Sequence, residues 1–139
     1  MEYISTRNTQ KTFSFKDVLL KGLAPDGGLF IPKKIPLYNL GELKKLRDLS
    51  YNELAVKIIL KFCNDEFNEI EIRDLVENSY KNFRVNNVIE IKKIGKINLL
   101  ELFHGPTLAF KDIAMQVIGN MYEKILEKNN LKVNIVVAT

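Results

Sequence analysis

The fold of this chain is decided by the stretch Phe103-His104-Gly105-Pro106-Thr107-Leu108-Ala109-Phe110-Lys111-Asp112. It joins an apolar run, Ile97 to Phe103, to a longer amphipathic run that extends from Leu108 to about Lys128. The apolar run predicts a strand, and the amphipathic run predicts a helix. The quoted residues therefore contain a predicted strand-to-helix loop.

The loop ends where a helix is expected to begin. Gly105 and Pro106 break the chain between the two runs, and Thr107 is the predicted N-cap of the helix. Lys111 then falls in the first helical turn. A helix N-terminus carries a partial positive charge and favours acidic residues, so a lysine there is in an unfavourable place if its only task is solubility.

The position of Lys111 suggests two interpretations. The residues stacked above it on the same helix face are Met115, Ile118 and Tyr122. A lysine between an apolar stripe and a positive helix end is expected to favour the neutral amine, which can attack a carbonyl and form a Schiff base. Alternatively, its apolar stem covers its neighbours while the ammonium group reaches solvent. The residues alone leave both interpretations open.

Three segments together resemble the threonine synthase family. Phe103 to Asp112 resembles its pyridoxal-phosphate lysine motif, and Ser5-Thr6-Arg7 resembles its opening Ser-Thr-Arg-Gly. The third segment, Gly22-Leu23-Ala24-Pro25-Asp26-Gly27-Gly28-Leu29-Phe30-Ile31-Pro32, resembles its next signature. Three signals in the right order are more specific than one short motif. Asn8 stands where the family usually has glycine, and asparagine adopts left-handed backbone more readily than most residues.

The resemblance implies an enzyme of threonine biosynthesis that uses pyridoxal 5'-phosphate to convert O-phospho-L-homoserine and water to L-threonine and phosphate. It implies that Lys111 both binds the cofactor and acts as the catalytic base and acid. His104 and Thr107 become candidate contacts for the substrate phosphate, whereas the alternative for His104 is a loop histidine bonded to backbone. Because the chain has one histidine and one cysteine, no metal site is expected.

Residues 1–87 predict a small, mainly helical region. Ser14 to Asp17 and Ser50 to Glu53 have the pattern of capping boxes, which start helices, and Gly22 is a predicted C-cap. Asp26-Gly27-Gly28 predicts a tight turn, which the resemblance places in the scaffold that faces the active site. The other elements predicted here are helices at Leu40 to about Leu49 and Asn68 to Phe83, and strands at Tyr3 to Thr6 and Leu29 to Ile31.

Residues 88–139 predict the start of an α/β domain. Val88 to Ile91 and Ile97 to Phe103 predict a hairpin, and Val133 to Ala138 predicts a buried strand of a parallel sheet. The expected fold class is therefore α/β, with the helical N-terminal region followed by the first strand-helix-strand unit of a fold type II pyridoxal-phosphate domain, related to the tryptophan synthase β subunit.

The resemblance also predicts that this domain is truncated. In the family the last strand leads into a loop, Ser-Gly-Asp-Thr-Gly, that holds the cofactor phosphate at a helix N-terminus. The 139 residues do not contain that loop. We therefore expect the chain to be the N-terminal portion of a longer enzyme and to be inactive by itself.

Composition excludes several classes of protein. No apolar run approaches the roughly 20 residues of a membrane helix, and the first residues lack the pattern of a signal peptide. Cys63 is alone and is predicted to be a small buried residue near a helix end, which favours the cytosol. The net charge is +4, but the lysines are scattered and most neighbour an acidic residue, which argues against a nucleic-acid site.

Two alternatives to a threonine synthase remain open from the sequence. One is a non-catalytic scaffold or interaction module that retains the lysine motif. The other is a related pyridoxal-phosphate lyase that acts on a different phosphorylated amino compound. The oligomeric state does not follow from the sequence.

Overall fold

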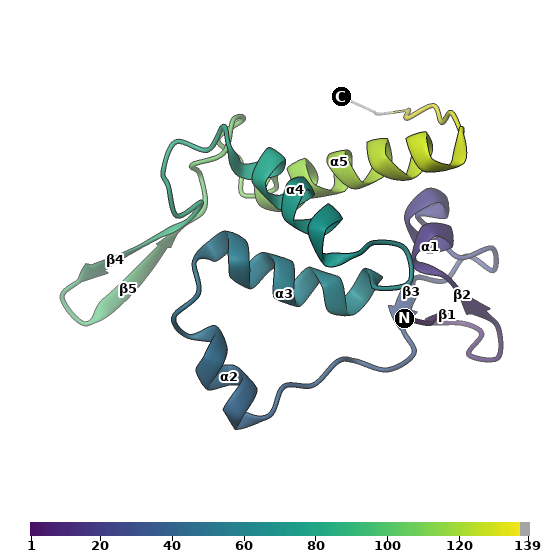
Figure 1. Cartoon of the computed structure of the whole chain (residues 1–139), viewed down its shortest axis with the longest axis horizontal. Helices are drawn as coiled ribbons and strands as arrows, with labels where there is room; N and C mark the ends of the chain where they lie inside the picture. The colour runs from purple at the N-terminus through teal and green to yellow at the C-terminus, as the bar shows by residue number, and fades with distance from the viewer. Residues whose placement is uncertain (137–139) are drawn as a thin grey trace.

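A computed structural model describes residues 1–136 of the chain (Figure 1). Helices α3, α4 and α5 form a central layer, with a small sheet and α1 at one end and a projecting hairpin at the other. Within the described range no helix is long and apolar enough to cross a membrane. The elements in chain order are β1 (Tyr3–Ser5), β2 (Thr12–Phe13), α1 (Phe15–Lys21), β3 (Phe30–Pro32), α2 (Leu40–Leu46), α3 (Tyr51–Cys63), α4 (Glu69–Tyr80), β4 (Glu90–Ile94), β5 (Ile97–Glu101) and α5 (Asp112–Asn129).

The core lies where α3, α4 and α5 contact one another. Each helix is amphipathic and buries one apolar stripe against its neighbours. Its fully buried members include Val56 of α3, Ile72 and Val76 of α4, and Ile125 of α5. Burying each such side chain contributes about 1.5–3 kcal/mol, so this shared stripe is the main source of stability for the layer.

Side chains cap the helices of the N-terminal region. Ser14, Asn39, Ser50 and Asn68 each accept a hydrogen bond from the backbone three residues later, and an acidic side chain at that position bonds back to the cap. The capping boxes predicted at Ser14 and Ser50 are therefore confirmed. The predicted C-cap at Gly22 is confirmed as well, with a φ of 68°.

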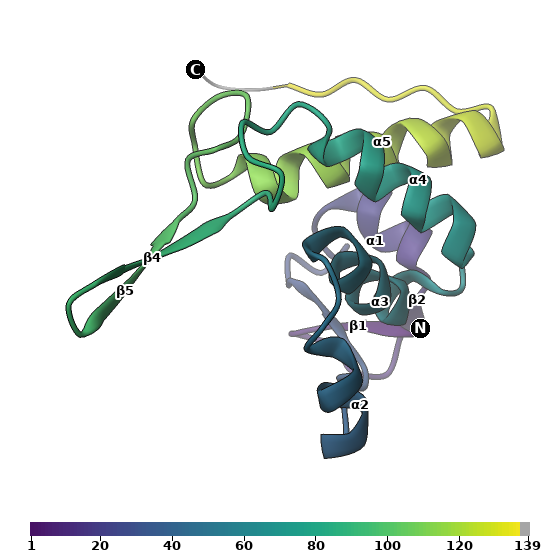
Figure 2. The same ribbon diagram turned by 60° about the vertical axis from the view of Figure 1, so that its left-hand side comes forward.

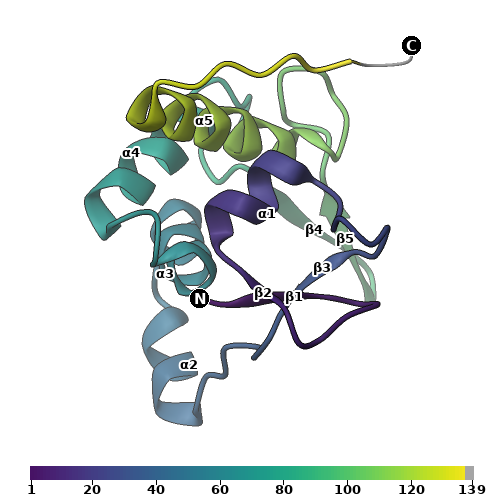
Figure 3. The ribbon, with the colours of Figure 1, turned by 90° about the vertical axis from the view of Figure 1, so that its right-hand side faces the viewer.

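A three-stranded antiparallel sheet lies beside α1, in the order β2-β1-β3 (Figure 3). The strands predicted near Tyr3 and Leu29 correspond to β1 and β3, whereas β2 has only two residues and was not predicted from the sequence.

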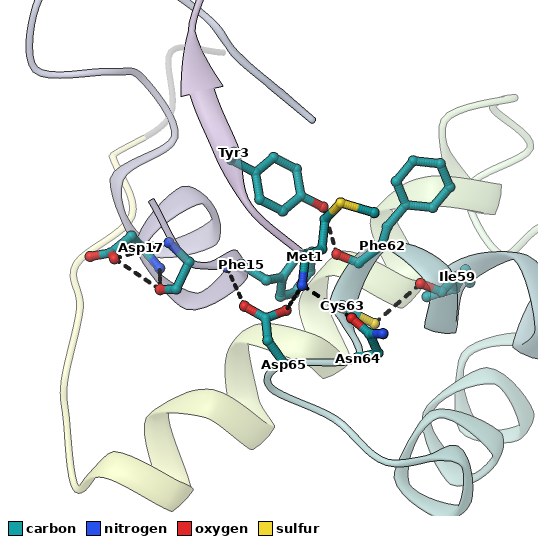
Figure 4. A network of polar contacts seen from close by, with 10 residues as sticks. Met1, Tyr3, Phe15, Asp17, Ile59, Phe62, Cys63, Asn64 and Asp65 are labelled. Atoms are coloured by element: carbon teal, nitrogen blue, oxygen red, sulfur yellow. Dashed lines mark hydrogen bonds and ion pairs between the residues drawn. The ribbon is translucent and has the colours of Figure 1, made fainter. Parts of the chain in front are cut away.

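The N-terminal strand is tied to the C-terminal end of α3 (Figure 4). The Tyr3 hydroxyl donates to the Phe62 carbonyl at 2.7 Å, and the Met1 amino group lies 3.4 Å from an Asp65 carboxylate oxygen. Cys63, the last residue of α3, is fully buried, and its thiol donates to the Ile59 carbonyl. The prediction of a small buried residue near a helix end is therefore confirmed. Burial also raises the pKa of the Cys63 thiol to about 12.

The predicted hairpin is also confirmed. Strands β4 and β5 pair antiparallel, with Ile94 opposite Ile97 around a turn in which Gly95 has a φ of 61°. Figure 2 shows the hairpin extending away from the helices. The side chains of Ile91, Ile94 and Ile97 are exposed there.

The structure differs from the sequence prediction in the bounds of several elements and in one strand. Helix α4 ends at Tyr80 rather than Phe83, β4 spans Glu90–Ile94 rather than Val88 to Ile91, and β5 ends at Glu101 rather than Phe103. Helix α2 ends at Leu46 rather than near Leu49, and α5 begins at Asp112 rather than Leu108. The predicted strand at Val133 to Ala138 is absent from residues 133–136, which have no regular secondary structure, and residues 137 and 138 lie outside the described range. A strand needs a paired neighbour, and within residues 1–136 no strand pairs with this segment. The domain boundary near residue 87 stays a prediction.

The cap of α4 generates a prediction about acid stability. Glu71 belongs to the capping box of Asn68, and a hydrogen bond from Lys128, followed by the Asn68 backbone bond, lowers the pKa of its carboxyl. A pKa that is lower in the folded state stabilises the fold above the unfolded pKa of about 4.3, and the effect is lost as pH falls through the folded value. Glu71→Gln should therefore reduce stability by about 1 kcal/mol near pH 7 and by progressively less toward about pH 3.

Thermal unfolding across this pH range measures the difference. The matched control is Glu77→Gln on the same helix, because Glu77 is exposed and makes no ion pair within residues 1–136. An equal loss for Glu71→Gln at pH 7 and pH 3 would contradict the assigned role of the carboxylate.

Candidate functional site

The loop that precedes α5 is closed by a buried carboxylate. Asp112 is 4% exposed, and its two oxygens accept hydrogen bonds from Thr107: one from the backbone N–H at 2.8 Å and one from the hydroxyl at 2.7 Å. The prediction that Thr107 is the N-cap of the helix is therefore wrong. The first residue of α5 instead reaches back to hold the loop, and we call this arrangement the Asp112 clamp.

Gly105 makes room for the Asp112 clamp. A Cβ atom at this position would lie 2.4 Å from both the Cβ and the Oδ2 atom of Asp112, which is far inside van der Waals contact.

The loop also contains Leu108 with a φ of 63°, a left-handed conformation that is rare for a branched side chain. Such strained residues are found where surrounding contacts over-determine the backbone, and they cluster at functional sites.

Lys111 lies at the boundary between the loop and α5. It occupies the N-cap position, one residue before the helix, so its predicted place in the first turn is corrected by the later start of α5. Its backbone carbonyl accepts hydrogen bonds from the N–H groups of Ala114 and Met115. The backbone that carries the lysine is therefore fixed on its helical side by α5 and on its loop side by the Asp112 clamp.

The side chain of Lys111 is exposed and makes no hydrogen bond or ion pair with residues 1–136. The described residues do not enclose Lys111 in the apolar stripe that the sequence predicts above it. Met115, which was predicted to lie above it, is 56% exposed, while Ile118 and Tyr122 are half-buried. The reason is the position of the buried stripe of α5, which runs through Val117, Met121 and Ile125 and faces away from Met115.

The first turn of α5 is also held from α4. The Tyr80 hydroxyl donates to the Ile113 carbonyl at 3.0 Å, and burial raises the pKa of this hydroxyl well above its ordinary value, so it stays a donor. About two turns further on, the Asn120 side-chain amide donates to the Ser79 hydroxyl at 2.9 Å. These two bonds fix the N-terminal half of α5 against α4.

His104 lies in a polar cluster on the other side of the loop. Its side chain is 12% exposed, and Nε2 is 2.9 Å from a carboxylate oxygen of Glu101. The other Glu101 oxygen is 3.1 Å from the Lys92 ammonium. His104 therefore bonds through its ring to a carboxylate rather than to backbone. Sequence reasoning overlooked Glu101 and Lys92, although Glu101 precedes the histidine by three residues.

The carboxylate of Glu101 is held in its charged form. The hydrogen bond from Lys92 and, more weakly, that from His104 lower its pKa, against the opposing effect of desolvation. Glu90 lies close by, so that ligand atoms of Glu90, Glu101 and His104 fall within 4.8 Å of one another. The Lys92 ammonium is 3.1 Å from Glu101 and 4.0 Å from Glu90, so it already supplies a positive charge to this group.

The two N-terminal signatures bind each other. The Ser5 hydroxyl donates to an Asp26 carboxylate oxygen at 2.7 Å, and the Gly28 N–H donates to the same oxygen at 2.9 Å. These bonds lower the pKa of Asp26, with the Ser5 bond as the largest cause. A Cβ atom at Gly28 would lie 2.3 Å from the Ser5 hydroxyl oxygen. Asp26 therefore holds the turn against β1, which is a structural role.

Asn8 fits its loop without a left-handed backbone. Among the described residues other than glycine, positive φ occurs at Val88, Leu108 and Asn130, and not at Asn8. Its side-chain oxygen accepts a hydrogen bond from the Gln10 N–H at 3.0 Å. The loop after β1 therefore does not require a glycine at this position.

Comparisons with known proteins agree with this description. Residues 2–80 match the family model described as threonine synthase N terminus. The chain is 42% identical over 132 residues to the threonine synthase of Schizosaccharomyces pombe, covering 94% of this chain and 26% of that protein. It is 39% identical over 140 residues to the threonine synthase of Pseudomonas aeruginosa, covering 100% of this chain and 30% of that protein.

Two solved structures are similar in fold. A pyridoxal-phosphate-bound threonine synthase from Brucella melitensis aligns with a TM-score of 0.89 and 37% identity, over 94% of this chain and 28% of that one. A yeast threonine synthase aligns with a TM-score of 0.88 and 41% identity, over 93% of this chain and 27% of that one. Both solved structures are α/β enzymes whose chains are much longer than this chain.

The chain belongs to the threonine synthase family and matches its N-terminal part. It spans between 26% and 30% of the length of the two curated relatives named above.

The close approach of Gly105 and Asp112 generates a prediction. Gly105→Ala should destabilise the fold by about 1–3 kcal/mol, because the new methyl group displaces Asp112 and breaks its bonds to Thr107. Chemical denaturation measures the change. Gly119→Ala is the matched control: nothing lies within 4 Å of its added Cβ, and alanine in a helix interior should stabilise α5 by about 1 kcal/mol. Equal effects of the two substitutions would show that the Asp112 clamp does not constrain the loop.

Proposed function

We propose that this chain is the N-terminal portion of a threonine synthase, which converts O-phospho-L-homoserine and water to L-threonine and phosphate with pyridoxal 5'-phosphate. The observation that carries the proposal is the Lys111 loop: an exposed amine on a backbone fixed by α5 and by the Asp112 clamp. The family match over residues 2–80 supports the assignment. The single buried cysteine, which has no partner for a disulfide, supports a cytosolic location.

The residues present fit the cofactor. A lysine that binds a carbonyl needs a reachable amine that is not held in an ion pair, and Lys111 satisfies both conditions within residues 1–136. The Brucella melitensis relative is a pyridoxal-phosphate-bound threonine synthase. A threonine synthase that contains this chain would therefore hold its cofactor through Lys111.

When bound, the cofactor supplies an electron sink for the charge that develops at the substrate carbon atoms. Lys111 supplies the proton transfers, because an amine close to Cα can accept a proton as general base and return it as general acid. Lys111 would accept one proton from Cα and one from Cβ, which allows phosphate to leave from Cγ. Protons then return to Cγ and Cα, and water adds its hydroxyl at Cβ, which gives L-threonine. Arginine cannot replace Lys111, since it does not readily lose its proton.

We assign different roles to the two candidate phosphate contacts. His104 has one ring nitrogen on Glu101, and its other ring nitrogen makes no hydrogen bond within residues 1–136. Thr107 already donates both its hydroxyl and its N–H to Asp112, so its contribution is to hold the loop rather than to donate to a phosphate. His104 is therefore the better candidate for the substrate phosphate.

The main prediction concerns the site of cofactor attachment. Borohydride reduction of the whole enzyme in the presence of pyridoxal phosphate, followed by peptide mass spectrometry, should place the pyridoxyl group on Lys111. Lys111→Ala should remove this label and lower kcat for threonine formation by at least about 10³-fold. The matched control is Lys124→Ala on α5, which should keep both label and activity. A pyridoxyl group on another lysine in the unsubstituted enzyme would contradict the proposal.

The same experiment separates the alternatives. A non-catalytic module that retains the motif would take no label. A related lyase would be labelled at Lys111 but would not form threonine from O-phosphohomoserine.

The 139-residue chain by itself should give little or no turnover, because the resemblance assigns the cofactor phosphate loop to residues that this sequence does not contain.

A further inference from the structure

The polar cluster next to His104 shows how this side chain is held. Glu101 is the last residue of β5 and is 7% exposed, an unusual degree of burial for a carboxylate. Its Oε1 is 3.1 Å from Lys92 Nζ, and its Oε2 is 2.9 Å from His104 Nε2. The two oxygens of one carboxylate therefore bridge a strand residue and a loop residue.

The hairpin register explains why Lys92 is needed. Glu90 and Glu101 are directly opposite each other across β4 and β5, which places two like charges in a cross-strand pair. Lys92 is two residues from Glu90 on the same face of β4 and approaches both carboxylates. Its ammonium group offsets the repulsion and fixes the Glu101 side chain.

The bond from Glu101 determines which ring nitrogen of His104 is free. An ionised carboxylate can only accept hydrogen bonds, so Nε2 carries the hydrogen and Nδ1 is left for another partner. The rest of the residue is held as well: its carbonyl accepts a hydrogen bond from the Arg84 N–H at 2.9 Å, and its ring packs on Phe103 with 4.7 Å between centroids. The imidazole therefore has little freedom to turn over.

We propose that Glu101 and Lys92 are positioning residues that hold the His104 ring with Nδ1 available to the substrate phosphate. This inference rests on the proposed function. In the complex with the substrate, a hydrogen bond to the phosphate requires a hydrogen on Nδ1 as well as on Nε2. The ring then carries a positive charge, which the neighbouring Glu101 carboxylate stabilises. Lys92 acts through Glu101, and neither residue needs to touch the substrate.

The first test observes the ring directly. The His104 Nε2–H proton should give a slowly exchanging downfield resonance in the whole enzyme, identified by its disappearance in His104→Ala. Glu101→Ala should abolish this resonance, because the exposed N–H then exchanges with water. If the unsubstituted enzyme lacks the resonance, or if Glu101→Ala retains it, the positioning role is wrong.

The second test uses kinetics. Glu101→Gln in the whole enzyme should raise the KM for O-phosphohomoserine about tenfold, while kcat changes by less than about twofold. Lys92→Met should raise KM in the same direction, and Lys92→Arg should restore it. Lys93→Met is the matched control, since Lys93 lies next to Lys92 on β4 but makes no ion pair within residues 1–136. Thermal unfolding checks that each variant is folded.

The outcomes distinguish this inference from the proposed function. An unchanged KM for Glu101→Gln, together with a raised KM for His104→Ala, would reject the positioning role and leave His104 as a substrate contact. An unchanged KM for both variants would reject the contact itself, and with it the positioning role. Neither result affects the borohydride label on Lys111, which tests the proposed function independently.

Discussion

The two hydrogen bonds from Thr107 to the buried carboxylate of Asp112 are the constraint on which the candidate site depends. They draw residues 105–111 into a closed loop, and they require a glycine at position 105. They also set where α5 begins, because Asp112 is both the end of the loop and the first residue of the helix. Lys111 lies between these two structures, so its backbone cannot move without breaking one of them.

The helical layer supplies the fixed frame for this loop. Buried side chains of α4 and α5 pack together, and the Tyr80 hydroxyl bonds to the first turn of α5. On the other side, the hairpin carries Glu101 and Lys92 to His104. Lys111, which we propose as the cofactor lysine, and His104, the candidate phosphate contact, are thus held by different elements that meet in one loop.

Much of the fold could be predicted because its signals are local. Ser14 and Ser50 each form a capping box with the acidic residue three positions later, so both helix starts can be predicted from four residues. Gly95 likewise identifies the hairpin turn from its immediate neighbours. The start of α5 could not be predicted in this way. Thr107 has the residue type of an N-cap, but its hydroxyl bonds to Asp112, whose burial depends on packing. Contacts across strands, such as Lys92 with Glu101, likewise follow from the register and not from spacing along the chain.

Amide hydrogen exchange at Thr107 measures whether the Asp112 clamp holds the loop, because the Thr107 N–H is bonded only to the Asp112 carboxylate among the described residues. We expect protection of the Thr107 amide similar to that of Met115, whose N–H bonds to Lys111 at the start of α5. Exchange of the Thr107 amide at the rate of an unprotected peptide would show that the Asp112 clamp does not hold the loop.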